Sequence, residues 1–219
     1  MTESLYCYKM THDTGFAPNP YHGVLTLATC KPTIRRCAGK GYWISGWTSN
    51  KVQGKNDKFR FEDETQALIY LAKVSHKITY KEYWENYPKK RQPTKSSEGG
   101  KDFFKSCGNG IVVRNDDISF CGDNIYEPDA NASFGFKQHE NPHHNKQNQE
   151  HDLSGKYVLV CEEFYYFGVE NAIPKNVIIN DKNFVVPRCK KIKLDDPIAK
   201  QIIDFVTKNY SSGINQKKI

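Results

Sequence analysis

The chain has 219 residues, of which 37% are hydrophobic and 13% aromatic, and a formal charge of +7. This length suits one sizeable domain with its own core. The positive charge attracts polyanions, so we expect nucleic acid or a phosphorylated ligand as partner. No stretch approaches the roughly 20 apolar residues of a membrane-spanning helix, and we expect no membrane contact.

The cysteines are odd in number, widely scattered and without a C-x-x-C pair: positions 7, 30, 37, 107, 121, 161 and 189. No leading apolar segment resembles a signal peptide. These features predict reduced thiols in a cytoplasmic protein. Most of the thiols are expected to be buried as small apolar groups. Cys30, beside Lys31, has the most obvious neighbour that would stabilise a thiolate.

A basic cluster follows the first predicted strand, residues 4–10, and its polar loop. Pro32 suits the first turn of a short helix that runs through Arg36. That helix would display Lys31, Arg35 and Arg36 close together. Guanidinium and ammonium groups bind phosphate well, so these residues are candidate phosphate ligands. The alternative is an ordinary solvated helix face.

An aromatic strand comes next, "YWISGW" at residues 42–47. Alternate residues of a strand share a face, so Trp43, Ser45 and Trp47 are expected to point together. Stacking a base on such a ring contributes about 1 to 3 kcal/mol, and Trp43 is our candidate. The alternative is that both tryptophans belong to the core. Residues 67–78, "ALIYLAKVSHKI", predict a further, longer strand.

A short helix is predicted after Thr79, because Thr79 and Glu82 have the spacing of a capping box and Pro88 would end the helix. Residues 89–110 form a basic, Ser- and Gly-rich excursion. Its "EGGK" lacks the full pattern of a nucleoside triphosphate-binding loop, so we expect none there.

The stretch "GDNIY", residues 122–126, offers a carboxylate, an amide and a phenol on a turn after an apolar strand. Asn124 can donate and accept hydrogen bonds, and Asp123 could accept from an exocyclic amine. With Tyr126, these residues are candidates for reading a base edge. The alternative is a turn whose side chains bond their own backbone.

Residues 129–152 form a polar loop of a length that is often functional or disordered. Histidine and aspartate could support general base chemistry if they met in space, either His12 and Asp13 after the first strand or members of this loop. The loop's histidines could also hold zinc, but their spacing matches no established pattern and no cysteine lies beside them. We therefore expect no metal. The loop residues concerned are His139, His143, His144, His151 and Asp152.

The last elements are a strand within "KYVLVCEEFYYFG", residues 156–168, and a helix. Phe164 and Tyr166 share one face of the strand, and Tyr166 is our candidate for a functional ring. Asp195 or Asp196 caps the helix that begins at Pro197, and residues 214–219 are expected to be a frayed tail. Many short strands and few helices predict a single α+β domain over residues 1–219. A curved sheet or small β-barrel would carry peripheral helices and this C-terminal helix.

Five blocks in this order resemble the nucleotide modification associated domain 2 family: "THDTGFAPNP", "GVLTLATCKPTIRR", "YWISGW", "GDNIY" and "LVCEEFYYFG". The family name implies an association with systems that modify nucleic-acid bases. The strand order is also similar to the PUA, ASCH, EVE and YTH group of small barrels. Members of that group commonly bind RNA or DNA, several through an aromatic pocket for an altered base, and one branch includes a small amidohydrolase. Related sequences often carry Gly-Asp-Trp where this chain has Gly41, Tyr42 and Trp43.

Three functions follow from these observations and from the resemblance. The first is binding of a nucleotide or modified base in a nucleic-acid modification or defence system, through the candidates named above. The second is an enzyme that hydrolyses or alters a modified base or nucleotide, with His12, Lys31 or Asp123 as acid or base. The third is a structural or protein-interaction component. We expect no cofactor. The base, the choice among DNA, RNA and free nucleotide, and the oligomeric state are left open.

Overall fold

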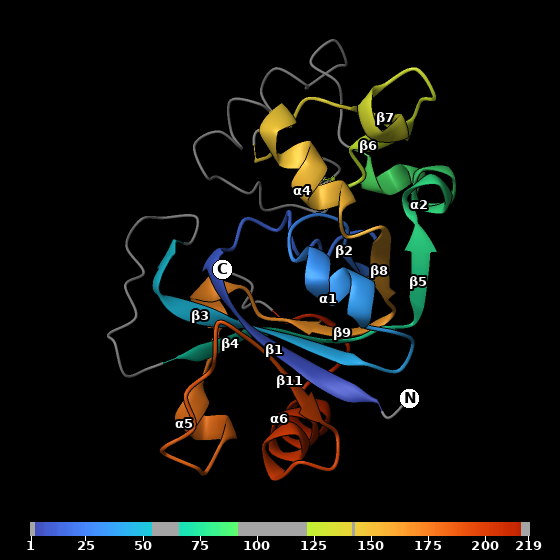
Figure 1. The fold of residues 1–219 in the computed structure, drawn as a ribbon. Coiled ribbons are helices and arrows are strands. Elements are labelled where there is room, and N and C mark those ends of the chain that lie inside the picture. Colours follow the sequence, from blue (N-terminus) through green and yellow to red (C-terminus); the bar gives the residue numbers. More distant parts are fainter. Residues whose placement is uncertain (1–2, 54–65, 92–121, 142, 216–219) are drawn as a thin grey trace. The chain divides into compact units, whose positions relative to one another are not determined.

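A computed structural model of the chain describes residues 3–53, 66–91, 122–141 and 143–215 (Figure 1). The chain divides into two compact units. The first consists of Met1–Asp13, Gly39–Ser75 and Cys161–Ile219, and the second of Thr14–Ala38 and His76–Val160. A single domain over residues 1–219 stays a prediction.

The first unit is built on a seven-stranded mixed sheet in the order β11-β1-β3-β4-β9-β12, with β10 also paired to β4. β1 runs parallel to β3 and antiparallel to β11, and β4 is antiparallel to both β3 and β9. Over the described residues the sheet does not close into a barrel, so the small barrel is wrong and the α+β class is confirmed. A PUA-like fold stays a prediction. The strands are β1 (Ser4–His12), β3 (Trp43–Gln53), β4 (Ala67–Lys73), β9 (Glu163–Tyr166), β10 (Ile173–Pro174), β11 (Cys189–Lys193) and β12 (Gly213–Ile214).

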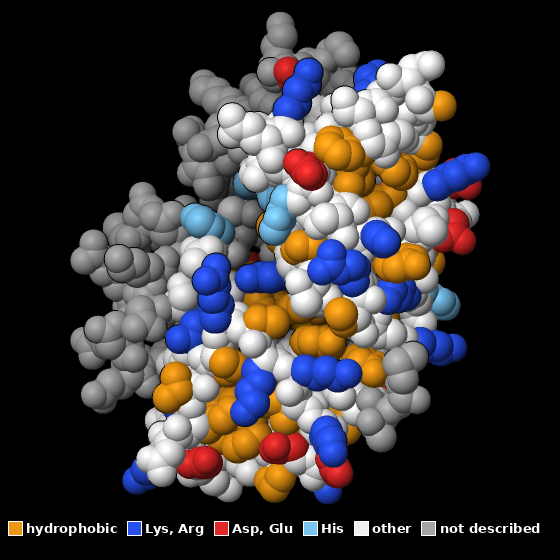
Figure 2. All heavy atoms as spheres, viewed as in Figure 1, with side chains coloured by type: hydrophobic (Ala, Val, Ile, Leu, Met, Phe, Trp, Pro, Cys, Tyr) orange, Lys and Arg blue, Asp and Glu red, His pale blue; other side chains and the backbone are white. Residues whose placement is uncertain are grey.

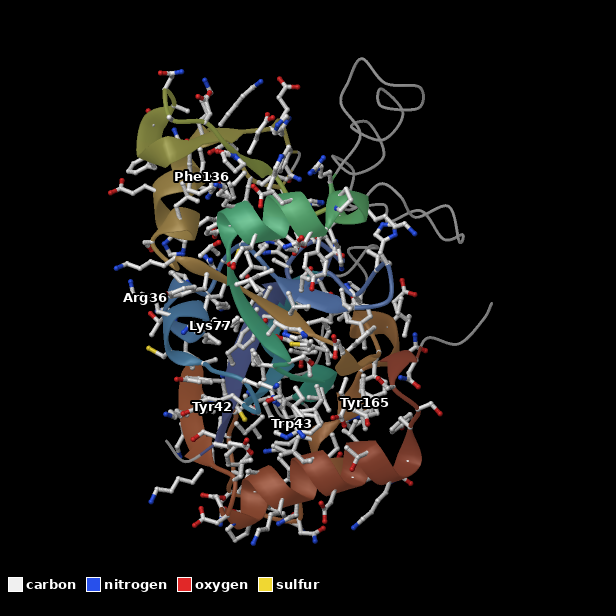
Figure 3. All side chains as sticks on the ribbon, turned by 90° about the vertical axis from the view of Figure 1, so that its right-hand side faces the viewer. Arg36, Tyr42, Trp43, Lys77, Phe136 and Tyr165 are labelled. Carbon is white, nitrogen blue, oxygen red and sulfur yellow. The ribbon has the colours of Figure 1, made fainter. Side chains whose placement is uncertain are left out.

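The core of the first unit lies between this sheet and α6 (Pro197–Asn209). Trp43 and Tyr165 extend from the sheet toward α6 (Figure 3). The helix begins where the Asp196 side chain accepts the Ile198 N–H at 2.8 Å, which confirms the predicted cap. Ala199, Ile202 and Val206 of α6 are buried at helical spacing, as an amphipathic helix requires. The described residues of this unit also form two shorter helices, η4 (Val169–Asn171) and α5 (Lys175–Ile178).

The second unit contains a three-stranded sheet in the order β2-β8-β5 and a two-stranded hairpin, β6 with β7. Several short helices surround these strands. The strands are β2 (Leu25–Leu27), β5 (His76–Thr79), β6 (Tyr126–Pro128), β7 (Phe136–Gln138) and β8 (Tyr157–Cys161). The helices are α1 (Pro32–Cys37), α2 (Tyr80–Asn86), η1 (Pro88–Lys90), η2 (Ser133–Gly135), η3 (Lys146–Asn148) and α4 (Gln149–Leu153).

Local sequence explains α1 and α2. Pro32 occupies the first turn of α1, as predicted. At α2 the Thr79 N–H donates to Glu82 Oε2 at 2.7 Å and the Glu82 N–H donates to Thr79 Oγ1 at 3.2 Å, so the predicted capping box is confirmed. The buried side of α2 carries Tyr80 and Tyr83, which join the apolar core of this unit.

Three predicted segments are wrong in their extent. The single strand over residues 67–78 is two strands, β4 and β5, which belong to different sheets. The strand within residues 156–168 is likewise divided into β8 and β9. The polar loop over residues 129–152 contains β7, η3 and α4. Apolar periodicity is local and does not show where a chain changes partner strands. The strand before Gly122, most of the 89–110 excursion and most of the tail lie outside the described residues.

The five cysteines in the described ranges are free thiols: Cys7, Cys30, Cys37, Cys161 and Cys189. Burial raises the pKa of Cys7 to about 12, so that thiol stays protonated and unreactive at neutral pH. Across the same ranges no helix combines the length and the apolar character needed to cross a membrane.

Candidate functional site

Three side chains of the second unit meet in the order thiol, imidazole, carboxylate. The Sγ of Cys30 lies 3.3 Å from Nε2 of His144, and Nδ1 of the same ring lies 2.5 Å from Oδ2 of Asp152. Asp152 is fully buried, His144 is 9% exposed and Cys30 is half-buried. A nucleophile, a base and a group that orients the base are the parts of a thiol-based catalytic centre.

Cys30 lies on a strained turn that leads into α1. Its φ is 55° and that of Lys31 is 41°, so two consecutive non-glycine residues are in the left-handed region. Each such residue costs about 1 to 3 kcal/mol, and such residues are concentrated at functional sites. The Cys30 N–H donates to Asp152 Oδ1 at 2.7 Å, which helps to hold the turn. The backbone N–H of Cys30 is therefore used in a hydrogen bond within the site.

Arg35 connects the Cys30 turn to α4. Its Nε donates to the carbonyl oxygen of Cys30 at 2.7 Å, and Nη2 donates to the carbonyl oxygen of Asp152 at 2.5 Å. Nη1 donates to the hydroxyl of Tyr80 and the carbonyl of Tyr157. Arg35 is 0% exposed, so the alternative of a solvated helix face is wrong for this residue, and phosphate binding by Arg35 stays a prediction. The guanidinium donates hydrogen bonds to backbone carbonyls, and no sequence pattern predicts such bonds.

His144 is positioned to carry a proton at neutral pH. Burial disfavours the imidazolium, but the hydrogen bonds to Asp152 and Cys30 outweigh burial and raise the pKa of His144 to about 9. The ring of Phe16 lies 5.0 Å from the imidazole. An imidazolium beside a sulfur stabilises the thiolate, which is the nucleophilic form of cysteine.

Cysteine, histidine and aspartate are also residues that hold zinc, and their candidate ligand atoms lie within 4.8 Å of one another. Here, however, the imidazole presents Nε2 to Cys30 and Nδ1 to Asp152. The two nitrogens point in different directions from one ring, so an ion bound to the thiolate, one imidazole nitrogen and the carboxylate would replace one of these two contacts. The geometry therefore fits a proton relay better than a metal chelate.

The predicted base-reading residues Asp123 and Asn124 are buried and bonded to α2. Asp123 accepts from the Tyr83 hydroxyl at 2.5 Å and the Thr26 hydroxyl at 2.8 Å, and burial raises its pKa. Asn124 Nδ2 donates to the carbonyls of Tyr83 and Tyr87. Their roles in base reading, and that of Asp123 as acid or base, stay predictions that require these bonds to open.

Lys31 and Arg36 flank the buried Arg35. Lys31 is half-buried directly before α1, whereas Arg36 is exposed and donates from Nη1 to the Ser154 carbonyl at 3.2 Å. Lys77 Nζ donates to the Arg36 backbone carbonyl, and both residues are labelled in Figure 3. Phosphate binding by Lys31 and Arg36 stays a prediction.

Three further predicted site residues, His12, Trp43 and Tyr166, belong to the first unit. His12 is exposed at the end of β1, and its Nδ1 lies 3.1 Å from Thr11 Oγ1. Trp43 is 5% exposed and Tyr166 is 3% exposed, and the Tyr166 hydroxyl donates to the buried carboxylate of Asp13. A base needs an open ring face to stack, and neither buried ring presents one. Base stacking on Trp43 or Tyr166 stays a prediction, and it requires the ring to be uncovered first.

The face shared by Trp43, Ser45 and Trp47 is confirmed, since Trp47 Nε1 donates to Ser45 Oγ at 2.9 Å, but it is a core face. Tyr42, at the position where related sequences often carry Asp, is 5% exposed and stacks on Tyr6. Its ring also contacts the Lys191 ammonium, 5.0 Å from the ring centre.

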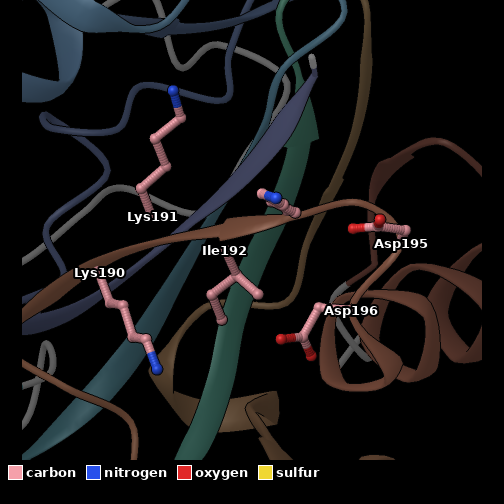
Figure 4. Close-up of a pocket in the computed structure, with 6 residues that line it drawn as sticks. Lys190, Lys191, Ile192, Asp195 and Asp196 are labelled. Carbon is pink, nitrogen blue, oxygen red and sulfur yellow. The ribbon is translucent and has the colours of Figure 1, made fainter.

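An open hollow of about 450 Å³ lies beside β11 in the first unit (Figure 4). Lys190 and Lys191 leave the strand on opposite sides in this view, as strand alternation requires. The lining mixes charges: Lys190, Lys191, Ile192, Lys193, Asp195 and Asp196.

Sequence reasoning missed the arrangement of Cys30, His144 and Asp152. The available signals were a cysteine beside a lysine and a polar segment with several histidines and Asp152. Since 114 residues separate Cys30 from His144, only the fold brings them together.

Residues 2–217 match the sequence model of a family described as nucleotide modification associated domain 2. The match runs through both units and includes the Cys30, His144 and Asp152 centre. Comparisons with curated proteins and with solved structures give no match. The family description implies a role in systems that modify nucleotides. Because the match covers nearly the whole chain, this protein belongs to the nucleotide modification associated domain 2 family.

Proposed function

We propose that this chain is a thiol-dependent enzyme of nucleotide modification, with Cys30 as nucleophile, His144 as acid and base, and Asp152 as the group that orients His144. The observation that carries this proposal is the continuous contact from Cys30 Sγ to His144 Nε2 and from His144 Nδ1 to Asp152 Oδ2. Burial and strain at the same residues support it. A reduced, cytoplasmic setting is part of the proposal, because a nucleophilic thiol must stay unoxidised.

The reaction that suits these groups is hydrolysis at an sp² carbon that bears an amine or oxygen leaving group. The Cys30 thiolate adds to the carbon, the bond to the leaving group breaks, and the Nε2 proton of His144 passes to that group. Water then adds to the same carbon and gives a proton to His144, and the carbon–sulfur bond breaks to restore the thiolate. Water is the second reactant. The substrate we infer, from the family relationship, is a modified base or nucleotide.

Selective alkylation tests the nucleophile directly. Near pH 6 ordinary thiols are almost fully protonated and react slowly. We expect iodoacetamide to modify half-buried Cys30 about tenfold faster than exposed Cys37, as followed by peptide mass spectrometry. His144→Gln should remove this difference, because the imidazolium beside the sulfur is then absent. Equal rates at the two cysteines, or no effect of His144→Gln, would contradict a nucleophilic Cys30.

Turnover tests the substrate class. The protein and Cys30→Ala are incubated with modified nucleosides, nucleotides and oligonucleotides, and binding and mass change are followed together. We expect a mass change with one substrate class in the unmodified protein and none with Cys30→Ala. Undiminished turnover by Cys30→Ala would overturn the proposed mechanism. Binding of nothing in the panel would favour a structural or protein-interaction component.

Binding of a nucleotide or modified base without chemistry is the second candidate function. It is favoured by the exposed lysines of β11, Lys190, Lys191 and Lys193, which line the hollow of the first unit. Lys and Arg side chains are also spread over the face shown in Figure 2. Tight binding that never leads to a product, with an unreactive Cys30, would support this candidate over the enzyme.

A further inference from the structure

The hydroxyl of Tyr126 bonds to the carboxylate oxygen that also contacts His144. It donates to Asp152 Oδ2 at 2.8 Å, and His144 Nδ1 lies 2.5 Å from the same oxygen. Tyr126 is 1% exposed, and its ring packs edge-on against Tyr80 with the ring centres 5.4 Å apart. Burial and the neighbouring Asp152 raise the pKa of Tyr126, so its hydroxyl stays protonated and donates.

The "GDNIY" stretch fixes the position of this hydroxyl. Asp123 and Asn124 bond to side-chain and backbone groups of α2, as described above. Ile125 is fully buried, and its carbonyl accepts the His139 N–H at 2.8 Å. The three residues before Tyr126 are therefore held by hydrogen bonds or by packing. This leaves the phenol of Tyr126 little freedom to move away from Asp152.

We propose that Tyr126 is a positioning residue of the Cys30 centre and that "GDNIY" serves to hold its hydroxyl on Asp152. This inference rests on the proposed function. The hydroxyl shares Oδ2 with the imidazole, so it weakens the hold of the carboxylate on the imidazole proton. Tyr126 thereby sets the pH at which His144 releases that proton, and with it the pH range in which Cys30 and His144 work together.

The other groups around the pair do not duplicate this role. In the described part of the chain, the carboxylate of Asp152 accepts from the Cys30 N–H, the Tyr126 hydroxyl and His144. Arg35 and the Tyr80 hydroxyl bond instead to the backbone carbonyl of Asp152. The remaining polar contact of the imidazole is Cys30 Sγ at Nε2. Among the described side chains, Tyr126 and His144 are thus the two that bond to the carboxylate of Asp152.

The sign of the effect follows from charge. A donor stabilises the carboxylate most when His144 is neutral, because an imidazolium already compensates part of the negative charge. Removal of the Tyr126 hydroxyl therefore favours the protonated imidazole. We expect the loss of the His144 proton to move upward by about 0.5 to 1 pH unit in Tyr126→Phe.

The experiment measures the rate of Cys30 alkylation by iodoacetamide between about pH 5 and 10. Tyr83→Phe is the matched control, because Tyr83 is another buried phenol of the second unit that donates to a buried carboxylate, Asp123, at 2.5 Å. We expect Tyr126→Phe to shift the alkaline part of the pH profile of Cys30 alkylation toward higher pH. Tyr83→Phe should shift the profile much less, because it loosens one bond of the stretch and leaves the Tyr126 hydroxyl on Asp152.

An unshifted profile in Tyr126→Phe, or an equal shift in Tyr83→Phe, would overturn the inference while Cys30 remains a reactive nucleophile. A Cys30 that is no faster than Cys37 in the unmodified protein would instead contradict the proposed function itself. If Tyr126→Phe does not fold, Asn124→Ser decides the matter, because it loosens the same stretch and keeps the phenol. We expect a smaller upward shift there, and no shift would overturn the inference.

Discussion

Gly155 lies directly against the guanidinium of Arg35: a Cβ at position 155 would come 2.3 Å from Nη1 and 2.4 Å from Cζ. The end of an arginine side chain usually moves aside at little cost. Here the guanidinium is bonded to the carbonyls of Cys30 and Asp152, so it cannot move without loosening both sides of the candidate site.

Gly155→Ala is therefore expected to lower the free energy of unfolding by about 1 to 3 kcal/mol, as overpacking at a fixed group does. It should also slow alkylation of Cys30. Gly39→Ala is the control, because nothing lies within 4 Å of the added Cβ. Urea denaturation and alkylation rates check both effects. A Gly155→Ala protein as stable and reactive as Gly39→Ala would show that the Arg35 guanidinium can move without loosening the site.

Two adjacent arginines of α1 should differ sharply in their effect on stability. Arg35→Ala leaves several buried carbonyls without their donor and is expected to cost about 3 kcal/mol or more. Arg36→Ala, at an exposed position, should change the free energy of unfolding by less than about 0.5 kcal/mol. Urea titrations of the two variants provide the measurement. Equal losses would contradict the burial of Arg35.

The stability of the protein should fall in mild alkali because of His144. Its pKa in the folded protein, about 9, lies above its ordinary value of 6.5. The stabilisation is therefore complete below about pH 6.5 and is lost as the pH rises through 9. It amounts to about 3 kcal/mol at most. Denaturation of the unmodified protein and His144→Gln at several pH values measures it. Parallel curves for the two proteins would contradict the elevated pKa.

If the lysines of β11 bind nucleic acid, the affinity for an oligonucleotide should fall steeply with salt. Each lysine–phosphate pair that is removed should reduce the slope of log affinity against log salt by about 0.7 to 0.9. Replacing Lys190, Lys191 and Lys193 by Ala should therefore flatten the slope. The control replaces Lys200 and Lys208 of α6, which are also exposed in the first unit. Because the control removes two charges and the test variant three, a change about two thirds as large in the control would indicate only an effect of net charge.

The sequence predicted the elements whose causes are local. The capping box at Thr79, the Asp196 cap and Pro32 at the start of α1 act over one helical turn, and all three predictions are confirmed. Alternation correctly predicted that Trp43 and Trp47 share a face, but it left open whether that face is core or ligand site, because burial depends on the packing of α6 against the sheet.

The candidate site was beyond reach of the sequence because its parts are distant and its roles are shared with ordinary residues. Histidines in a polar segment are usually solvated, and Arg35 beside Arg36 resembles a charged helix face. What distinguishes His144 and Arg35 is the partner each finds elsewhere in the chain. Tyr126 was predicted to contact a base, whereas its hydroxyl bonds to Asp152.

The second unit is assembled from two separate stretches, Thr14–Ala38 and His76–Val160. Cys30 lies in the first stretch, and its bond to Asp152 spans 122 residues. Contacts between such distant residues form late, because closing a long loop is unfavourable until other interactions compensate. During synthesis, Cys30 leaves the ribosome long before its histidine and aspartate exist. The growing chain therefore carries an ordinary thiol, which acquires its activating partners only after most of the protein has been made.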